Sequence, residues 1–144
     1  MTTHVTETPA AASDVALCHF EDMLAFETDC WDVHESLKSA EPDFIVVDVR
    51  GPASFAKGHV RGAINIPHRE ITAQRMAEYS KGEVFAVYCA GPHCNGANRA
   101  AVRLARLGLA PDLVFFLGDN VYWRGSADLY KSRFDDVYEP LIRE

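Results

Sequence analysis

The fold is decided by one stretch, Val84-Phe-Ala-Val-Tyr-Cys-Ala-Gly-Pro-His-Cys-Asn-Gly-Ala-Asn-Arg99. In this stretch, a strand-like run is followed by the start of a helix-like segment. Val84–Tyr88 is a short β-branched and aromatic run, which is typical of a buried strand. The segment Gly96–Leu107 repeats apolar residues at helical spacing, carries arginines near its other face, and is followed by Gly108. A strand that leads into a helix indicates an α/β domain.

The rest of the chain repeats this alternation. Three further apolar runs read as strands, at Phe44–Asp48, Ala63–Ile66 and Leu113–Leu117. Continuous apolar strands are covered on both faces, which predicts an α/β domain of three layers, with a parallel sheet between helices. Ligands of such sheets bind beyond the carboxyl ends of the strands, here in the loops after Asp48, Tyr88 and Leu117.

Four shorter helices are expected between the strands. Trp31, Phe44 and Trp123 are expected in the core. The expected helices are Phe20–Phe26, a segment capped by Asp29 with Trp31, His34 and Leu37 on one face, Pro52–Lys57, and a less regular one marked by Ile71, Met76 and Tyr79.

Composition and charge restrict the possible partners. A length of 144 residues suits one domain, and the net charge of −7 argues against binding nucleic acid or an anionic membrane. Met1–Ala12 lacks the basic start and apolar stretch of a secretory signal, and no apolar run is long enough to span a bilayer. We therefore expect a cytoplasmic protein, either a monomer or a homodimer.

The four cysteines are Cys18, Cys30, Cys89 and Cys94. In a reducing compartment they are expected to be free thiols, although Cys89 and Cys94 are close enough in sequence to form a redox pair. Cys89, His93 and Cys94 supply only three of the four ligands that a structural zinc site needs, so we expect no metal and no other cofactor.

The loop around these two cysteines is the candidate site. A cysteine at a helix start meets unpaired backbone N–H groups and the positive end of the helix dipole, which favour a thiolate and lower its pKa. Such a thiolate is a nucleophile. Gly91 and Gly96 allow the backbone to curl into an anion cradle. The alternative is that both cysteines are buried structural thiols.

Four blocks of this sequence together resemble the rhodanese (sulfurtransferase) superfamily over roughly residues 33–124. They are Asp48-Val-Arg50, Gly58-His-Val-Arg-Gly-Ala-Ile-Asn-Ile-Pro67, the cysteine loop, and Gly118 with Trp123. The resemblance implies a flavodoxin-like parallel sheet and a six-residue active loop that starts with the catalytic cysteine. We expect residues 1–17 to be a disordered tail, 18–125 the rhodanese domain, and 126–144 an extension packed on the domain or on a partner.

The position of the nucleophile depends on where the loop is measured from. Counted back from the helix, Cys94 starts a six-residue loop that ends at Arg99; counted forward from the strand, Cys89 takes that position. We predict Cys94, because anion stabilisation depends on the helix start, and we keep Cys89 as the alternative nucleophile or as a resolving thiol. The substrate-binding residues predicted with Cys94 are Asn95, Gly96, Ala97, Asn98 and Arg99.

Several neighbouring residues have open roles. Ser54 stands where many family members have an acidic residue, which leaves the partner of Arg50 open. We expect His59 to hold two loops together rather than to act as a base. His93 either increases the thiolate fraction of Cys94 or is an exposed loop residue, and Asp48 is expected to bond the backbone of the cysteine loop.

The resemblance implies a sulfurtransferase that carries sulfur as a cysteine persulfide. The donor is a small anion such as thiosulfate, and the acceptor is cyanide, a small thiol or a protein thiol, with ping-pong kinetics. One alternative is a phosphatase or arsenate reductase of related fold, but those enzymes have five residues between cysteine and arginine, and four lie between Cys94 and Arg99. The other is a non-catalytic binding module, a kind that often lacks the cysteine.

Overall fold

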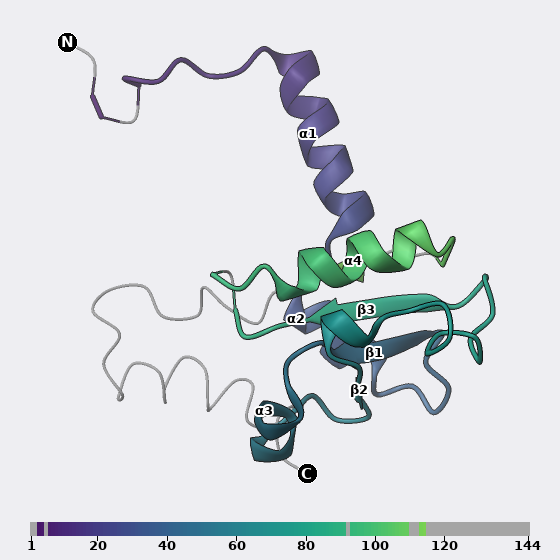
Figure 1. Cartoon of the computed structure of the whole chain (residues 1–144). Coiled ribbons are helices and arrows are strands. Elements are labelled where there is room, and N and C mark those ends of the chain that lie inside the picture. Colours follow the sequence, from purple (N-terminus) through teal and green to yellow (C-terminus); the bar gives the residue numbers. More distant parts are fainter. Residues whose placement is uncertain (1–2, 5, 92, 110–112, 115–144) are drawn as a thin grey trace.

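The computed structural model describes residues 3–4, 6–91, 93–109 and 113–114 (Figure 1). Helices and strands alternate along most of this part of the chain, as the sequence predicts. The helices are α1 (Ser13–Phe26), α2 (Cys30–Ser36), α3 (Pro52–Lys57), a short 3-10 helix η1 (His68–Glu70) and α4 (Gly96–Arg106), and the strands are β1 (Phe44–Asp48), β2 (Ile64–Asn65), β3 (Val84–Tyr88) and β4 (Leu113–Val114).

The strands form one parallel sheet in the order β2-β1-β3-β4. β1 and β3 pair along their whole length, from Phe44 beside Val84 to Asp48 beside Tyr88. Because both strands run the same way, their carboxyl ends lie together at one edge of the sheet. The loops that follow Asp48 and Tyr88 therefore start side by side.

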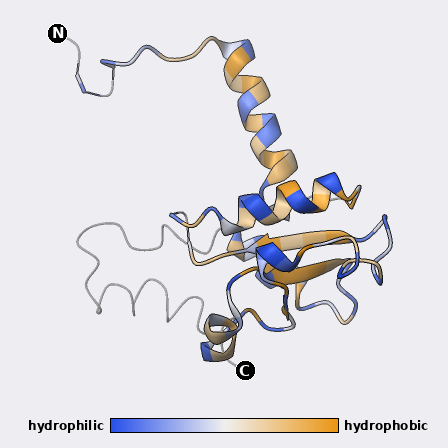
Figure 2. Cartoon of the chain, viewed as in Figure 1, coloured by the Kyte–Doolittle hydropathy of each residue, from blue (hydrophilic) through white to orange (hydrophobic). Residues whose placement is uncertain are grey.

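Alternate residues of the strands supply two apolar clusters, one on each face of the sheet. Val47, Phe85 and Val87 belong to the cluster that α4 covers with Ala97, Ala100 and Leu104. Val46, Ala86 and Tyr88 belong to the other cluster, together with Cys30 and Val33 of α2 and Phe55 of α3. Figure 2 shows the resulting apolar strands beside the alternating character of α4. The predicted three-layer arrangement is confirmed.

The helix after the cysteine loop forms as its sequence predicts. Helix α4 begins at Gly96, buries Ala97, Ala100 and Leu104, and exposes Arg99, Arg103 and Arg106. It ends before Gly108, whose φ of 68° lies in the left-handed region that glycine adopts without strain. Asp29 caps α2 by accepting a hydrogen bond from the backbone N–H of Asp32 at 2.8 Å.

The predicted helix around residues 71–79 is wrong. The 3-10 helix η1 is followed by turns over residues 73–78, although Ile71 and Met76 are both buried. The N–H of Met76 donates to the carbonyl of Thr72 at 2.9 Å, but this single turn is not extended into a helix. A first helical turn is costly, and it is stabilised only when further turns follow it.

The N-terminal prediction is also wrong in part. Helix α1 begins at Ser13 rather than Phe20, so residues 13–17 are helical and not disordered. It buries no residue and extends away from the sheet (Figure 1). Trp31, expected in the core, is 63% exposed, because α2 turns Cys30 and Val33 toward the sheet instead.

Only part of the last predicted strand is described. Leu113 and Val114 pair with β3, as expected. Gly118, Trp123 and the predicted extension 126–144 lie outside the described residues. No helix in the described part of the chain has the length and apolar character needed to cross a membrane.

Candidate functional site

The cysteine loop leaves β3 at the carboxyl edge of the sheet and returns to start α4. Its sharp turn lies at Gly91, whose φ of 138° disfavours any other residue. The backbone N–H of Cys94 donates to the carbonyl of Gly91 at 2.9 Å, which closes the turn. This turn brings Cys94 back toward Cys89.

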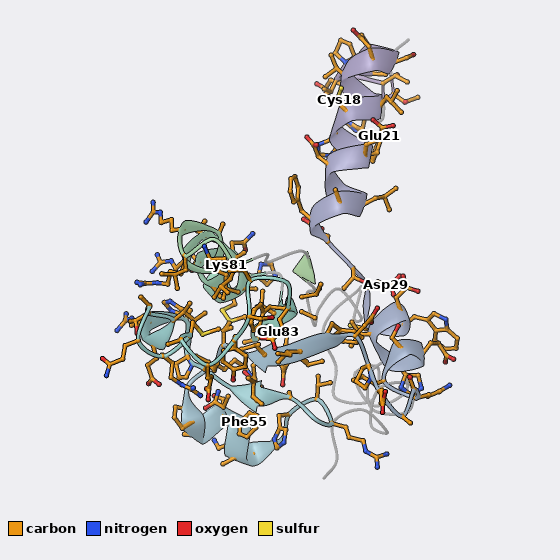
Figure 3. The ribbon with its side chains drawn as sticks, turned by 90° about the vertical axis from the view of Figure 1, so that its right-hand side faces the viewer. Cys18, Glu21, Asp29, Phe55, Lys81 and Glu83 are labelled. Carbon is orange, nitrogen blue, oxygen red and sulfur yellow. A yellow bond between two sulfur atoms is a disulfide. The ribbon has the colours of Figure 1, made fainter. Side chains whose placement is uncertain are left out.

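The two loop cysteines form a disulfide, with their Cα atoms 6.2 Å apart (Figure 3). The expectation that all four cysteines are free thiols is therefore wrong for this pair. The structure shows the alternative, in which Cys89 and Cys94 are close enough to form a bonded pair. Only four residues lie between Cys89 and Cys94 in sequence, and the turn at Gly91 makes this short separation compatible with a bond. Cys18 carries an exposed free thiol on α1 (Figure 3).

The two sulfurs differ in their access to solvent. Cys89 is 5% exposed and belongs to the apolar cluster under α4, whereas Cys94 is half-buried and packs against the same cluster from outside. Gly96 touches both: a Cβ atom there would lie 2.6 Å from Sγ of Cys89 and 3.3 Å from Sγ of Cys94. Only glycine fits at this position while the two sulfurs stay in place.

A groove with a volume of about 550 Å³ begins at Asn95, the residue after Cys94. Asn98 and Arg99 also line it, whereas Gly96 and Ala97 are buried in the first turn of α4. Three of the five predicted binding residues thus face one groove. The described residues that line it are His68, Arg69, Asn95, Asn98, Arg99, Val102, Arg103 and Arg106.

The groove is strongly basic in a chain of net charge −7. It gathers four arginines, and among the described residues none of the four forms an ion pair. Sequence reasoning did not predict Arg103 and Arg106 as groove residues, although their spacing from Arg99 places them near one face of the helix. Arg69 comes from η1, and no local pattern links it to α4.

His68 also reaches the groove from η1. Burial, followed by the charges of Arg69, Arg99 and Arg103, lowers the pKa of its imidazole. Its Nδ1 atom is buried and has no hydrogen-bond partner among the described residues. The groove therefore disfavours the protonated form of this imidazole, and sequence reasoning missed this residue.

A second polar cluster ends β1. The buried carboxylate of Asp48 accepts hydrogen bonds from Nη2 of Arg50 at 2.6 Å and from the hydroxyl of Tyr88 at 2.8 Å. The same hydroxyl accepts from the N–H of Val60 at 3.0 Å, and Arg50 donates to the carbonyl of Gly58 at 2.7 Å. Asp48 therefore binds Arg50 and Tyr88, and no hydrogen bond from the described cysteine loop reaches its carboxylate, contrary to expectation.

His59 and His93, both considered in the sequence analysis, lie in the described part of the chain. Nδ1 of His59 donates to the carbonyl of Phe55 at 2.9 Å, and the two rings stack with centroids 3.7 Å apart. Both contacts lie within one turn of the chain, so the expectation that His59 holds two loops together stays a prediction. His93 is exposed beside Cys94. In the described residues, no group of three or more His, Cys, Asp or Glu side chains is arranged to hold a metal ion.

Known proteins are similar to this chain in architecture and in sequence. Residues 32–125 match the family described as "Rhodanese-like domain". A solved structure of the BH2092 protein from Bacillus halodurans is 34% identical, with a TM-score of 0.68 over 73% of this chain and 77% of that one. The rhodanese-like domain of the Alr3790 protein from Anabaena shares the fold, with a TM-score of 0.53 at 22% identity over 74% of this chain and 73% of that one.

Two curated proteins are similar over part of their length. An "HTH-type transcriptional regulator Rv0324" of Mycobacterium tuberculosis is 36% identical over 72% of this chain and 42% of its own length. A "Probable molybdopterin-synthase adenylyltransferase" of Gracilaria tenuistipitata var. liui is 31% identical over 53% of this chain and 22% of its own length. The chain thus spans less than half of either relative. By the match over residues 32–125, the chain belongs to the rhodanese-like domain family.

Proposed function

We propose that the chain is a sulfurtransferase in which Cys94, once reduced, carries sulfane sulfur as a persulfide. The observation that carries this proposal is the half-buried position of Cys94 at the start of α4, next to a groove with four arginines. A reducing compartment such as the cytoplasm would keep the pair in the required dithiol state.

The groove favours a small anionic donor such as thiosulfate. Four cations without partners among the described residues produce a positive potential that concentrates anions, even though the whole chain is negative. Asn95, Asn98 and Arg99 supply hydrogen-bond donors on the side nearest Cys94.

The transfer takes place in two half-reactions. The Cys94 thiolate attacks the outer sulfur of thiosulfate, a sulfur–sulfur bond forms at Sγ, and sulfite leaves with the electron pair of the broken bond. A thiophilic acceptor such as cyanide or a thiolate then removes the outer sulfur and releases the Cys94 thiolate. Because Cys89 is 5% exposed and packed under α4, we assign the first attack to Cys94.

Steady-state transfer from thiosulfate to cyanide tests this function. We expect ping-pong kinetics, loss of at least roughly a thousand-fold in kcat for Cys94→Ser, and partial retention in Cys89→Ser. Cys18→Ser, which changes an exposed thiol on α1, is the matched control. Turnover that persists in Cys94→Ser but disappears in Cys89→Ser would assign the nucleophile to Cys89 instead.

The two alternatives predict different results for the same variants, the first in this transfer assay and the second with aryl phosphates as substrates. A non-catalytic binding module would show no transfer in any variant. A phosphatase would hydrolyse aryl phosphates in a Cys94-dependent way, which we do not expect because only four residues separate Cys94 from Arg99. Such turnover would contradict the argument from loop length.

A further inference from the structure

We propose that the chain also reduces sulfane sulfur to sulfide: Cys89 attacks the Cys94 persulfide, expels hydrogen sulfide and leaves the Cys89–Cys94 disulfide. This inference rests on the proposed function, because it begins from the persulfide of Cys94. It adds a second fate for that persulfide, in which no sulfur acceptor takes part.

The contact between the two sulfurs carries the inference. Sγ of Cys89 is bonded to Sγ of Cys94, so the fold brings these atoms together with the loop closed by the Cys94–Gly91 hydrogen bond. Gly96 leaves the space that both sulfurs occupy, since a Cβ atom there would clash with Cys89. A thiol held at this place competes well with thiols in solution, because its attack is intramolecular.

The different exposure of the two sulfurs sets the direction of the reaction. Displacement at sulfur proceeds through attack on one sulfur and departure of the other on its far side. Cys89 approaches Cys94 from the buried cluster under α4, whereas Cys94 is half-buried and so has an open side. The outer sulfur of the persulfide can therefore leave toward solvent.

The step balances as a two-electron exchange. The Cys89 thiolate forms a bond to Sγ of Cys94, and the bond from that Sγ to the outer sulfur breaks. The outer sulfur leaves with the electron pair as hydrosulfide, which is protonated to hydrogen sulfide. The two cysteines are oxidised to the disulfide, and the sulfane sulfur is reduced to sulfide. A second turnover needs an external dithiol reductant, which reduces the Cys89–Cys94 disulfide by thiol–disulfide exchange and is itself oxidised to a disulfide.

A single-turnover experiment without any added thiol tests this activity. The full-length chain is reduced, freed of reductant under anaerobic conditions, and mixed with excess thiosulfate. We expect about one sulfide released for each chain, and an intact mass lower by two hydrogens than that of the reduced protein. Peptide mapping is expected to find the disulfide between Cys89 and Cys94.

Cys89→Ser separates this inference from the proposed function. The variant is expected to gain one sulfur atom, to keep it as a persulfide, and to release at least tenfold less sulfide than the wild type. If Cys89→Ser gains no sulfur, the proposed function fails. If Cys89→Ser gains sulfur but the wild type also keeps its persulfide without releasing sulfide, only this inference fails.

A matched control excludes attack by a thiol of another chain. Cys18 is the exposed free thiol of the described chain, and Cys18→Ser is expected to release sulfide as the wild type does. The rate constant of sulfide release is expected to stay the same over a tenfold range of protein concentration. A rate constant that rises with concentration would overturn the intramolecular step.

Discussion

The sheet ends in two clusters that lie side by side but differ in how their polar groups are satisfied. At the end of β1, the carboxylate of Asp48 is fully buried and bonded to Arg50 and Tyr88. After β3, Cys94 is half-buried, and the groove beyond it holds arginines without ion-pair partners in the described residues.

From this difference we infer that the first cluster stabilises the fold and that the second is the reactive one. A buried charge whose hydrogen bonds are all made inside the protein holds the fold and has nothing left to offer a ligand. Exposed cations without partners attract anions, and a cysteine beside them has a solvent-facing side. Substitutions at the two clusters should therefore affect different properties.

The largest effect on stability is expected from Asp48→Ala. It removes the partner of Arg50 and of the buried Tyr88 hydroxyl, so the free energy of unfolding should fall by about 3 kcal/mol. Cys94→Ser, measured under reducing conditions, should change it by less than about 0.5 kcal/mol. Urea unfolding of the reduced proteins measures both values. Equal losses in the two variants would contradict the division into stabilising and reactive clusters.

A smaller effect is expected from the groove. Replacing both Arg99 and Arg103 by Gln should raise KM for thiosulfate by about tenfold, which corresponds to roughly 1.4 kcal/mol, and change kcat little. The effect should shrink at high ionic strength because salt screens exposed charges. Arg75→Gln is the control, since Arg75 is paired with Glu78 outside the groove. An equal increase in this control would show that overall charge, and not the groove, attracts the donor.

The elements of the fold and the contacts between them differ in how far they could be predicted from sequence. The strands and α4 were predictable because their apolar periodicity is local. The groove that Arg69 and His68 share with the α4 arginines was not predictable, because η1 and α4 are separated in sequence and meet only in the folded chain. The bond between Tyr88 and Asp48 depends on the register of β1 and β3, which no local pattern specifies.

Other errors came from short elements. A helix of seven residues such as α2 offers more than one plausible apolar face, and choosing the one with Trp31 rather than Cys30 and Val33 reversed its orientation. The sequence left the Cys89–Cys94 disulfide undecided for a related reason. The spacing of the two cysteines permits a bond, but only the turn at Gly91 brings the sulfurs together.

The reactivity of the cysteines gives a further comparison. In Cys89→Ser, the rate of alkylation of Cys94 against pH should have its midpoint below the value of about 8.5 for a free cysteine, because the start of α4 favours the anion. Peptide analysis at each pH separates this residue from Cys18. A midpoint at or above the free value would remove the electrostatic basis for a nucleophile at Cys94.

An effect confined to alkaline pH is expected from Cys30, which lies in the other apolar cluster. Burial, followed by the charge of Asp29, raises the pKa of its thiol from 9.0 to about 11. The unfolded chain therefore loses this proton at lower pH than the folded chain, and stability should decrease as pH rises from about 9 to 11. Unfolding of Cys30→Ala over this range should show a shallower decrease. Parallel curves for the two proteins would contradict the raised pKa.

The most direct test of the account is to locate the transferred sulfur. Cys89→Ser is reduced, treated with thiosulfate, freed of excess donor, alkylated and digested, and the mass of each cysteine peptide is measured. We predict one added sulfur atom on the peptide that contains Cys94, and its removal when cyanide is added before alkylation. Sulfur on Cys18 or Cys30 instead, or on no cysteine, would contradict the assignment of Cys94 as the sulfur carrier.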